Sequence, residues 1–225
     1  MSATDERHPL DVACGISLLL VSAIDFYTAR SLSLVAYVEP RFVELVRVID
    51  TSLSVVCAIG VAAVLVSWPV LLRGSHRRLT LGVLALQTTG LSLDVVGLIA
   101  STIFGEQSNP IYLLLEVALV HTSTVLLFTV WYATMDHHRQ VAHARGVAER
   151  QCFAFPQHSV RYPGYENWVP GYIDYLSLSF NMSSSLAPAE AMPLAISVKL
   201  LVILQVTISL VIIIVLAARA IGLIA

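Results

Sequence analysis

The sequence predicts an all-α integral membrane protein with about five transmembrane helices and a re-entrant, pore-like half helix before the last one. Hydrophobic residues make up 57% of the chain and charged residues only 12%. The mean hydropathy is +0.80. So few charged groups are unable to cover the exterior of a soluble fold. The apolar residues also gather in runs about as long as a membrane crossing.

Five segments are candidate spans, because about 20 apolar residues are needed to cross about 30 Å of hydrocarbon. They are residues 12–38, 51–72, 79–104, 111–135 and 196–217. Asp25 and Arg30 interrupt the first, which either spans as one long helix or stops near Ala29. Acidic residues flank its start where a secretory signal carries basic ones, so we expect a retained helix rather than a cleaved signal peptide.

Three further segments connect these spans. Residues 39–50 mix apolar and charged side chains, which is typical of an interfacial helix. Residues 136–167 are rich in His and Arg and then in aromatic residues, and we expect a polar loop there. Residues 170–190 begin with a proline and Asp174, both favourable in a first helical turn. The helix that follows is too short to span, so we expect it to re-enter the membrane, buried by protein.

Arginines predict the orientation, because basic residues collect on the cytoplasmic side. Three lie in residues 73–78 and three in residues 139–150, whereas the link 105–110 has none. Both basic segments are therefore expected to be cytoplasmic, with the N-terminus inside. Arg41 and Arg47 oppose this orientation from the other side.

Three ionisable residues lie within the firm spans, namely Asp94, Glu116 and His121. Asp94 and His121 each lie about 15 Å deep when counted from the link between their helices, so they can face each other. Such a pair is either a proton or ion relay or a buried hydrogen bond that pins two helices. Glu116 lies shallower.

Other kinds of chemistry find little support. The net charge of −2 gives no basic surface for nucleic acid. The three cysteines have no ligand spacing, and neither do Asp136, His137, His138 and His143, so we expect no metal and no cofactor. No GxSxG motif is present, and we expect the protein not to be an enzyme.

The tract IDYLSLSFNMSSSLAPAEAMP, residues 173–193, resembles the pore helix and filter of two-helix potassium channels, and residues 199–219 resemble their inner helix. The resemblance implies these candidate functional residues: Asp174, Asn181, Ser183, Ser184, Ser185 and Glu190. Residues 185–189 replace the TVGYG-like filter and contain no glycine, so we expect no potassium-selective filter. In those channels the loop before the pore helix is extracellular, whereas the arginines here place it inside.

A second resemblance covers roughly residues 77–225. Val120, His121 and Thr122 precede Tyr132, and an aspartate among aromatic residues precedes the tract Ser179–Ser183. These motifs are similar to those of a family of bacterial inner-membrane proteins known as domain of unknown function 1345. Ser183 and Ser185 differ from the Gly and Thr that are usual in that family. The resemblance implies a multi-pass protein of the bacterial inner membrane, which is the plasma membrane.

We therefore expect a channel-like or transport-related protein whose partners are the lipid bilayer and, in a channel, further copies that form a homo-oligomer such as a tetramer. The alternatives are a membrane scaffold or regulatory protein and, least supported, an intramembrane enzyme.

Overall fold

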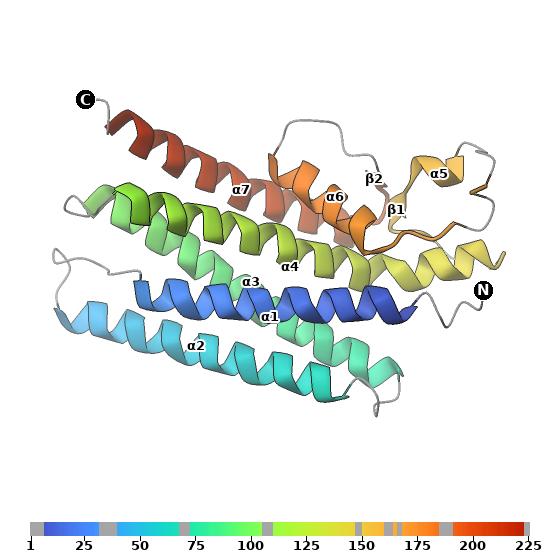
Figure 1. The fold of residues 1–225 in the computed structure, drawn as a ribbon, viewed down its shortest axis with the longest axis horizontal. Coiled ribbons are helices and arrows are strands. Elements are labelled where there is room, and N and C mark those ends of the chain that lie inside the picture. Colours follow the sequence, from blue (N-terminus) through green and yellow to red (C-terminus); the bar gives the residue numbers. More distant parts are fainter. Residues whose placement is uncertain are drawn as a thin grey trace.

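The computed structural model describes residues 7–31, 40–67, 73–104, 110–146, 150–159, 164–165, 168–184 and 191–222. Most of them are helical. The elements are α1 (Arg7–Ser31), α2 (Pro40–Ser67), α3 (Arg73–Phe104), α4 (Pro110–Ala144), β1 (Phe153–Ala154), α5 (Pro156–Ser159), α6 (Tyr172–Ser184), β2 (Met192–Pro193) and α7 (Ile196–Gly222). The long helices lie side by side, with α4 in contact with α1, α3, α6 and α7 (Figure 1).

Four helices among the described residues are long and apolar enough to cross a membrane. Their apolar stretches are Leu10–Thr28 in α1, Arg77–Ile99 in α3, Leu114–Ala144 in α4 and Ile196–Ala218 in α7. The stretch in α2 is shorter, Thr51–Val66. Large apolar side chains cover the outside of the bundle, for example Ile196, which is 77% exposed. This surface suits lipid as its solvent, and the arrangement fits the predicted all-α membrane fold.

Several helices differ in length from the prediction. α1 is unbroken through Asp25 and Arg30, whereas residues 32–38 of the expected span lie outside the described residues. α2 joins the expected interfacial helix 39–50 to the second span as one helix. α4 continues to Ala144, so the polar loop expected at 136–167 is wrong over its first residues. The helix can continue through these polar residues because Asp136 and Gln140 are buried and hydrogen-bonded to each other.

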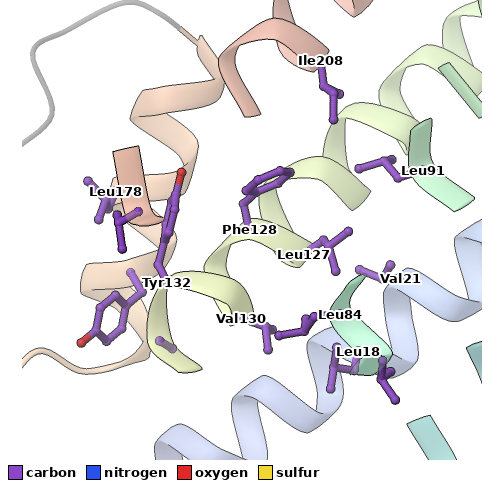
Figure 2. Packing of buried hydrophobic residues seen from close by; sticks show 14 of the residues in the cluster. Leu18, Val21, Leu84, Leu91, Leu127, Phe128, Val130, Tyr132, Leu178 and Ile208 are labelled. Carbon is purple, nitrogen blue, oxygen red and sulfur yellow. The ribbon is translucent and has the colours of Figure 1, made fainter. Parts of the chain in front are cut away.

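The apolar core is centred on α4. Figure 2 shows Leu127 and Val130 facing Leu84, Leu18 and Val21 from α3 and α1. Because lipid tails are as apolar as these side chains, close packing rather than exclusion of water stabilises the contacts.

A short ladder closes one end of the bundle. β1 pairs antiparallel with β2, with Phe153 opposite Pro193 and Ala154 opposite Met192. The Leu194 amide also donates to the Cys152 carbonyl at 2.8 Å. α7 therefore begins at the end of the bundle where α4 finishes, as Figure 1 shows.

α6 is a half-length helix that lies against α4 and α7 (Figure 1). Near its start, Tyr175 bonds to Asp136 beside the β1–β2 ladder. Near its end, Ser183 bonds to Gln205 of α7. Gln205 lies about 14 Å along α7 from Ile196 at the usual helical rise. α6 therefore runs from the ladder into the middle of the bundle, as expected for the short helix after Pro170.

Candidate functional site

Gln205 of α7 ties α6 to α4. Its amide nitrogen lies within hydrogen-bond distance of the Ser179 carbonyl (2.8 Å), Ser179 Oγ (2.9 Å) and Ser183 Oγ (2.7 Å). Its amide oxygen accepts a hydrogen bond from Tyr132, and Ser179 Oγ donates to the Val125 carbonyl at 2.8 Å. All four of these polar side chains are fully buried. One glutamine in the most apolar span thus joins three helices.

Asp136 performs a similar role nearer the ladder. Its Oδ1 accepts from the amides of Cys152 (2.8 Å) and Phe153 (3.3 Å). Its Oδ2 accepts from Gln140 Nε2 (2.8 Å) and the Tyr175 hydroxyl (3.1 Å). Burial raises the pKa of Tyr175 well above its usual range, and the Asp136 carboxylate raises it further, so the hydroxyl stays protonated and donates. Four donors satisfy this carboxylate, which marks it as a structural anchor.

Asp174 caps the start of α6. Its Oδ2 accepts a hydrogen bond from the Gly171 amide at 2.7 Å. An acidic residue in the first turn that reaches back to the residue before the helix satisfies an otherwise open amide and favours the helix dipole. Asp174 lies in the first turn, as predicted, and stabilises the helix, whereas Pro170 precedes the helix, which begins at Tyr172.

The other residues implied by the channel resemblance are placed less uniformly. Ser183 is fully buried and faces Gln205. Ser184 donates to the Asn181 carbonyl within α6 at 3.3 Å, and both residues are half-buried. Ser185 and Glu190 lie outside the described residues. Ser183, the fully buried serine of this group, therefore points into its own chain.

A second polar region lies between α1 and α3. Gln87 Nε2 donates to Ser22 Oγ at 3.0 Å, and further along both helices Thr28 Oγ1 donates to Asp94 Oδ2 at 3.2 Å. Residue numbers increase in the same direction along both helices from the first contact to the second, so α1 and α3 are parallel. All four side chains are buried. We call the contacts of residues 22–28 with residues 87–94 the polar seam.

Asp25 lies in the centre of the polar seam and is only 9% exposed. Its carboxylate is hydrogen-bonded to Ser54 of α2 and lies near Cys57. Gly90 leaves room for it on α3, since a Cβ at that glycine would lie 3.0 Å from Asp25 Oδ1. Among the described residues, Asp25 Oδ2 and Gln87 Oε1 are buried acceptors without a hydrogen-bond donor. Three helices therefore meet around a carboxylate with one open oxygen.

The depth of Asp94 allows it to face His121, but its carboxylate contacts α1. Asp94 is 3% exposed and accepts from Thr28. His121 of α4 is half-buried, and within the described part of the chain it forms no hydrogen bond with Asp94. Glu116, five residues before it, is buried with 8% exposure.

The two polar regions meet at one level of the bundle. Trp131 Nε1 donates to Thr88 Oγ1 at 2.9 Å, which fixes the register of α4 against α3. Tyr132, the neighbour of that tryptophan, bonds to Gln205, and Gln87, the neighbour of that threonine, belongs to the polar seam. α6 thus reaches this level from the ladder end, and the seam continues from it toward the opposite end.

The sequence contains partial signals for the residues that these polar regions add to the predicted ones. Asp25 interrupts the first span, and Gln205 is the one strongly polar residue of the last span from Leu200 onward. Asp136 and Gln140 were assigned to a loop, because hydropathy does not distinguish a solvated polar residue from a bonded one. Within the described ranges, no group of three or more His, Cys, Asp or Glu residues is arranged to hold a metal ion.

Cys152 marks the ladder end of the bundle. Its thiol is fully buried and lies 3.6 Å from the Met135 carbonyl. Burial raises its pKa, and the Asp136 carboxylate raises it further, whereas the guanidinium groups of Arg139 and Arg77 lower it. Two arginines from different helices thus act electrostatically on one thiol.

No protein-family model, curated protein or solved structure matched the chain. Function is therefore inferred from the residues themselves.

Proposed function

We propose that the protein crosses the membrane five times and is a channel-like or transport protein for protons or small cations, without a potassium-selective filter. The observation that carries the proposal is the pair of buried carboxyl groups, Asp25 and Asp94, on adjoining helices. Both residues lie inside apolar stretches, where an ionisable group is costly and usually serves a function.

The parallel arrangement of α1 and α3 supports the fifth crossing. If both helices span in the same direction, the chain must cross back between them. α2 connects them in sequence and packs against both. Its apolar stretch, Thr51–Val66, covers about 24 Å at the usual rise, and the helix continues beyond it at its start. A modest shortfall against the hydrocarbon thickness is accommodated by thinning of the bilayer or by tilt of its neighbours.

The chemistry of the polar seam suits small cations. Carboxylate, hydroxyl and amide oxygens replace part of the hydration shell of a hard cation, and a carboxylate also binds a proton directly. Asp25 Oδ2 and Gln87 Oε1 are acceptors without a donor among the described residues. An occupant that supplies positive charge or a proton would satisfy them.

The position of the half helix α6 also supports the transport proposal. Transporters place discontinuous helices at mid-membrane, where substrates bind, and α6 ends near Gln205 at the level where the seam begins. Because Ser183 and Gln205 face each other inside one chain, transport here does not require a fourfold pore. The Ser183 hydroxyl contacts the Gln205 amide, and the Ser184 hydroxyl contacts the Asn181 carbonyl.

The resemblance to the bacterial family known as domain of unknown function 1345 leads us to propose the bacterial inner membrane as the location.

The test is ion flux in liposomes that contain the purified protein. We expect flux of protons, Na⁺ or K⁺ above that of empty liposomes. Asp25→Asn and Asp94→Asn should each reduce it at least tenfold, equivalent to about 1.4 kcal/mol in the barrier. Asp174→Asn is the matched control, because it removes a carboxylate outside the polar seam and keeps an acceptor for the cap. Liposomes that stay silent to all three cations, or flux that both seam variants leave intact, would contradict the proposal.

The runner-up is a scaffold or regulatory protein. The dense bonding of α6 by Gln205 and Asp136 favours it, because fully satisfied buried networks rigidify a fold. Silent liposomes combined with purification of one stoichiometric partner would favour this role.

A further inference from the structure

Arginines from three parts of the chain gather at the ladder end of the bundle. Arg77 lies near the start of α3, Arg139 near the end of α4, and Arg150 just before β1. Arg139 Nη1 donates to the Arg150 carbonyl at 3.2 Å, and both Arg77 and Arg139 act on the Cys152 thiol. Arg78 and Arg145 flank this group and are exposed. We call the five residues the arginine cluster.

The arginine cluster lies at the expected height of lipid phosphates. The bond between Trp131 and Thr88 sets the register of the antiparallel helices α4 and α3. Counted from that bond, Arg77 is level with residue 142, and Arg139 is about one helical turn nearer the core. Arg77 and Arg78 are the first two residues of the apolar stretch Arg77–Ile99 of α3. Arginine stems of this length extend along apolar surface while the charged group reaches the interface.

No described acidic residue neutralises the cluster. None of its five arginines forms an ion pair within the part of the chain that the structure describes. Asp136 is close, but its carboxylate is fully buried and is occupied by four hydrogen bonds. The guanidinium groups are exposed at Arg77 and half-buried at Arg139. The cluster therefore keeps its positive charge and its donors for an external anion.

We propose that Arg77 and Arg139 bind the headgroup phosphate of an anionic phospholipid at this edge of the bundle, with Arg78, Arg145 and Arg150 enlarging the positive field. Guanidinium groups suit a phosphate because two parallel N–H donors match two of its oxygens. Two such groups from adjoining helices surround one phosphate from two sides.

The experiment measures phospholipid binding to the full chain in phosphatidylcholine nanodiscs that contain increasing amounts of phosphatidylglycerol. Native mass spectrometry counts the retained lipids, and the unfolding midpoint reports stabilisation. We expect phosphatidylglycerol to be retained over phosphatidylcholine. The double variant Arg77→Gln, Arg139→Gln should weaken that preference about 25-fold, since each basic residue near an anionic surface contributes about fivefold. Arg219→Gln, at the other end of α7, is the matched control and should bind like the parent.

Two further measurements separate the possible outcomes. Circular dichroism establishes that the double variant is folded, and the double variant Arg77→Lys, Arg139→Lys keeps the charge and should retain more of the preference than the glutamine variant. Equal retention of both lipids by the parent, or no loss in the folded glutamine variant, would overturn the proposal. So would equal stabilisation by millimolar inorganic phosphate in pure phosphatidylcholine, because the cluster would then be a site for free phosphate.

Discussion

Gly90 sets how closely Asp25 approaches α3. A Cβ at this position would lie 3.0 Å from Asp25 Oδ1 and 3.8 Å from Leu53 Cδ2. We predict that Gly90→Ala displaces the carboxylate, lowers the unfolding midpoint in detergent by an amount equivalent to about 1–3 kcal/mol, and reduces ion flux, because overpacking forces neighbouring groups to move. Thermal unfolding and liposome flux check the two effects.

Gly82 provides the matched control on the same helix. It is exposed, and a Cβ there would meet no atom within 4 Å. Gly82→Ala should therefore be neutral or stabilise the protein by up to about 1 kcal/mol, since alanine favours a helix over glycine. Equal unfolding midpoints for the two alanine variants would show that Gly90 does not limit the polar seam.

At the scale of single residues, the sequence identified which groups are costly in a membrane but not what they contact. The depths of Asp94 and His121 along their helices allow the two side chains to face each other. Depth leaves the rotation of a helix open, and the structure turns Asp94 toward Thr28. The sequence shows Asp25 only as an interruption of the first apolar span. Its contacts could not be predicted because they come from α2 and α3.

At the scale of elements, α6 depends on Gln205 for its position between α4 and α7. We predict that Gln205→Leu loosens α6, because the Tyr132 and Ser183 hydroxyls each lose a buried partner. The expected cost is about 1–3 kcal/mol, toward the lower value if other polar groups in the membrane replace the lost partner. Hydrogen exchange should increase across residues 172–184.

Thr207→Val is the control for this change, because Thr207 is exposed and, within the described residues, its hydroxyl bonds to the Ile203 carbonyl of its own helix, at 2.8 Å. It should leave exchange in α6 unchanged. Protection of α6 that survives Gln205→Leu would mean that apolar packing alone, such as that of Leu178, holds the half helix.

The existence of the elements was largely predictable, whereas their ends were not. Runs of apolar residues located α3, α4 and α7, and the proline and aspartate at its start located α6. α4 extends past the span predicted at 111–135 because Asp136 and Gln140 bond to the segment that carries β1. The tertiary fold brings that segment close to α4, so no local sequence pattern predicts that α4 extends so far. The resemblance to a channel pore likewise did not reveal that Ser183 faces its own chain.

At the scale of the whole molecule, the ladder end and the opposite end should lie on different sides of the membrane. The arginine cluster predicts that the ladder end is cytoplasmic. Tyr165, which is 44% exposed, contacts Trp168 at this end, whereas Val48, 56% exposed, lies before the apolar stretch of α2 at the other end. Cysteines at these two positions report the sides separately.

A membrane-impermeant maleimide should label Tyr165→Cys in inside-out vesicles and Val48→Cys in spheroplasts. The parent chain is the control: Cys57 and Cys152 are buried and Cys14 is half-buried within the apolar stretch of α1, so it should label weakly in both. Labelling of the two variants from the same side would contradict an odd number of crossings between them. Labelling with the two sides exchanged would leave the number of crossings unchanged and would show that the orientation is inverted. The arginines would then lie at the outer surface, without the attraction of the anionic cytoplasmic leaflet. The arginine cluster would then face the outer leaflet, and the lipid proposal would have to be tested with headgroups found there.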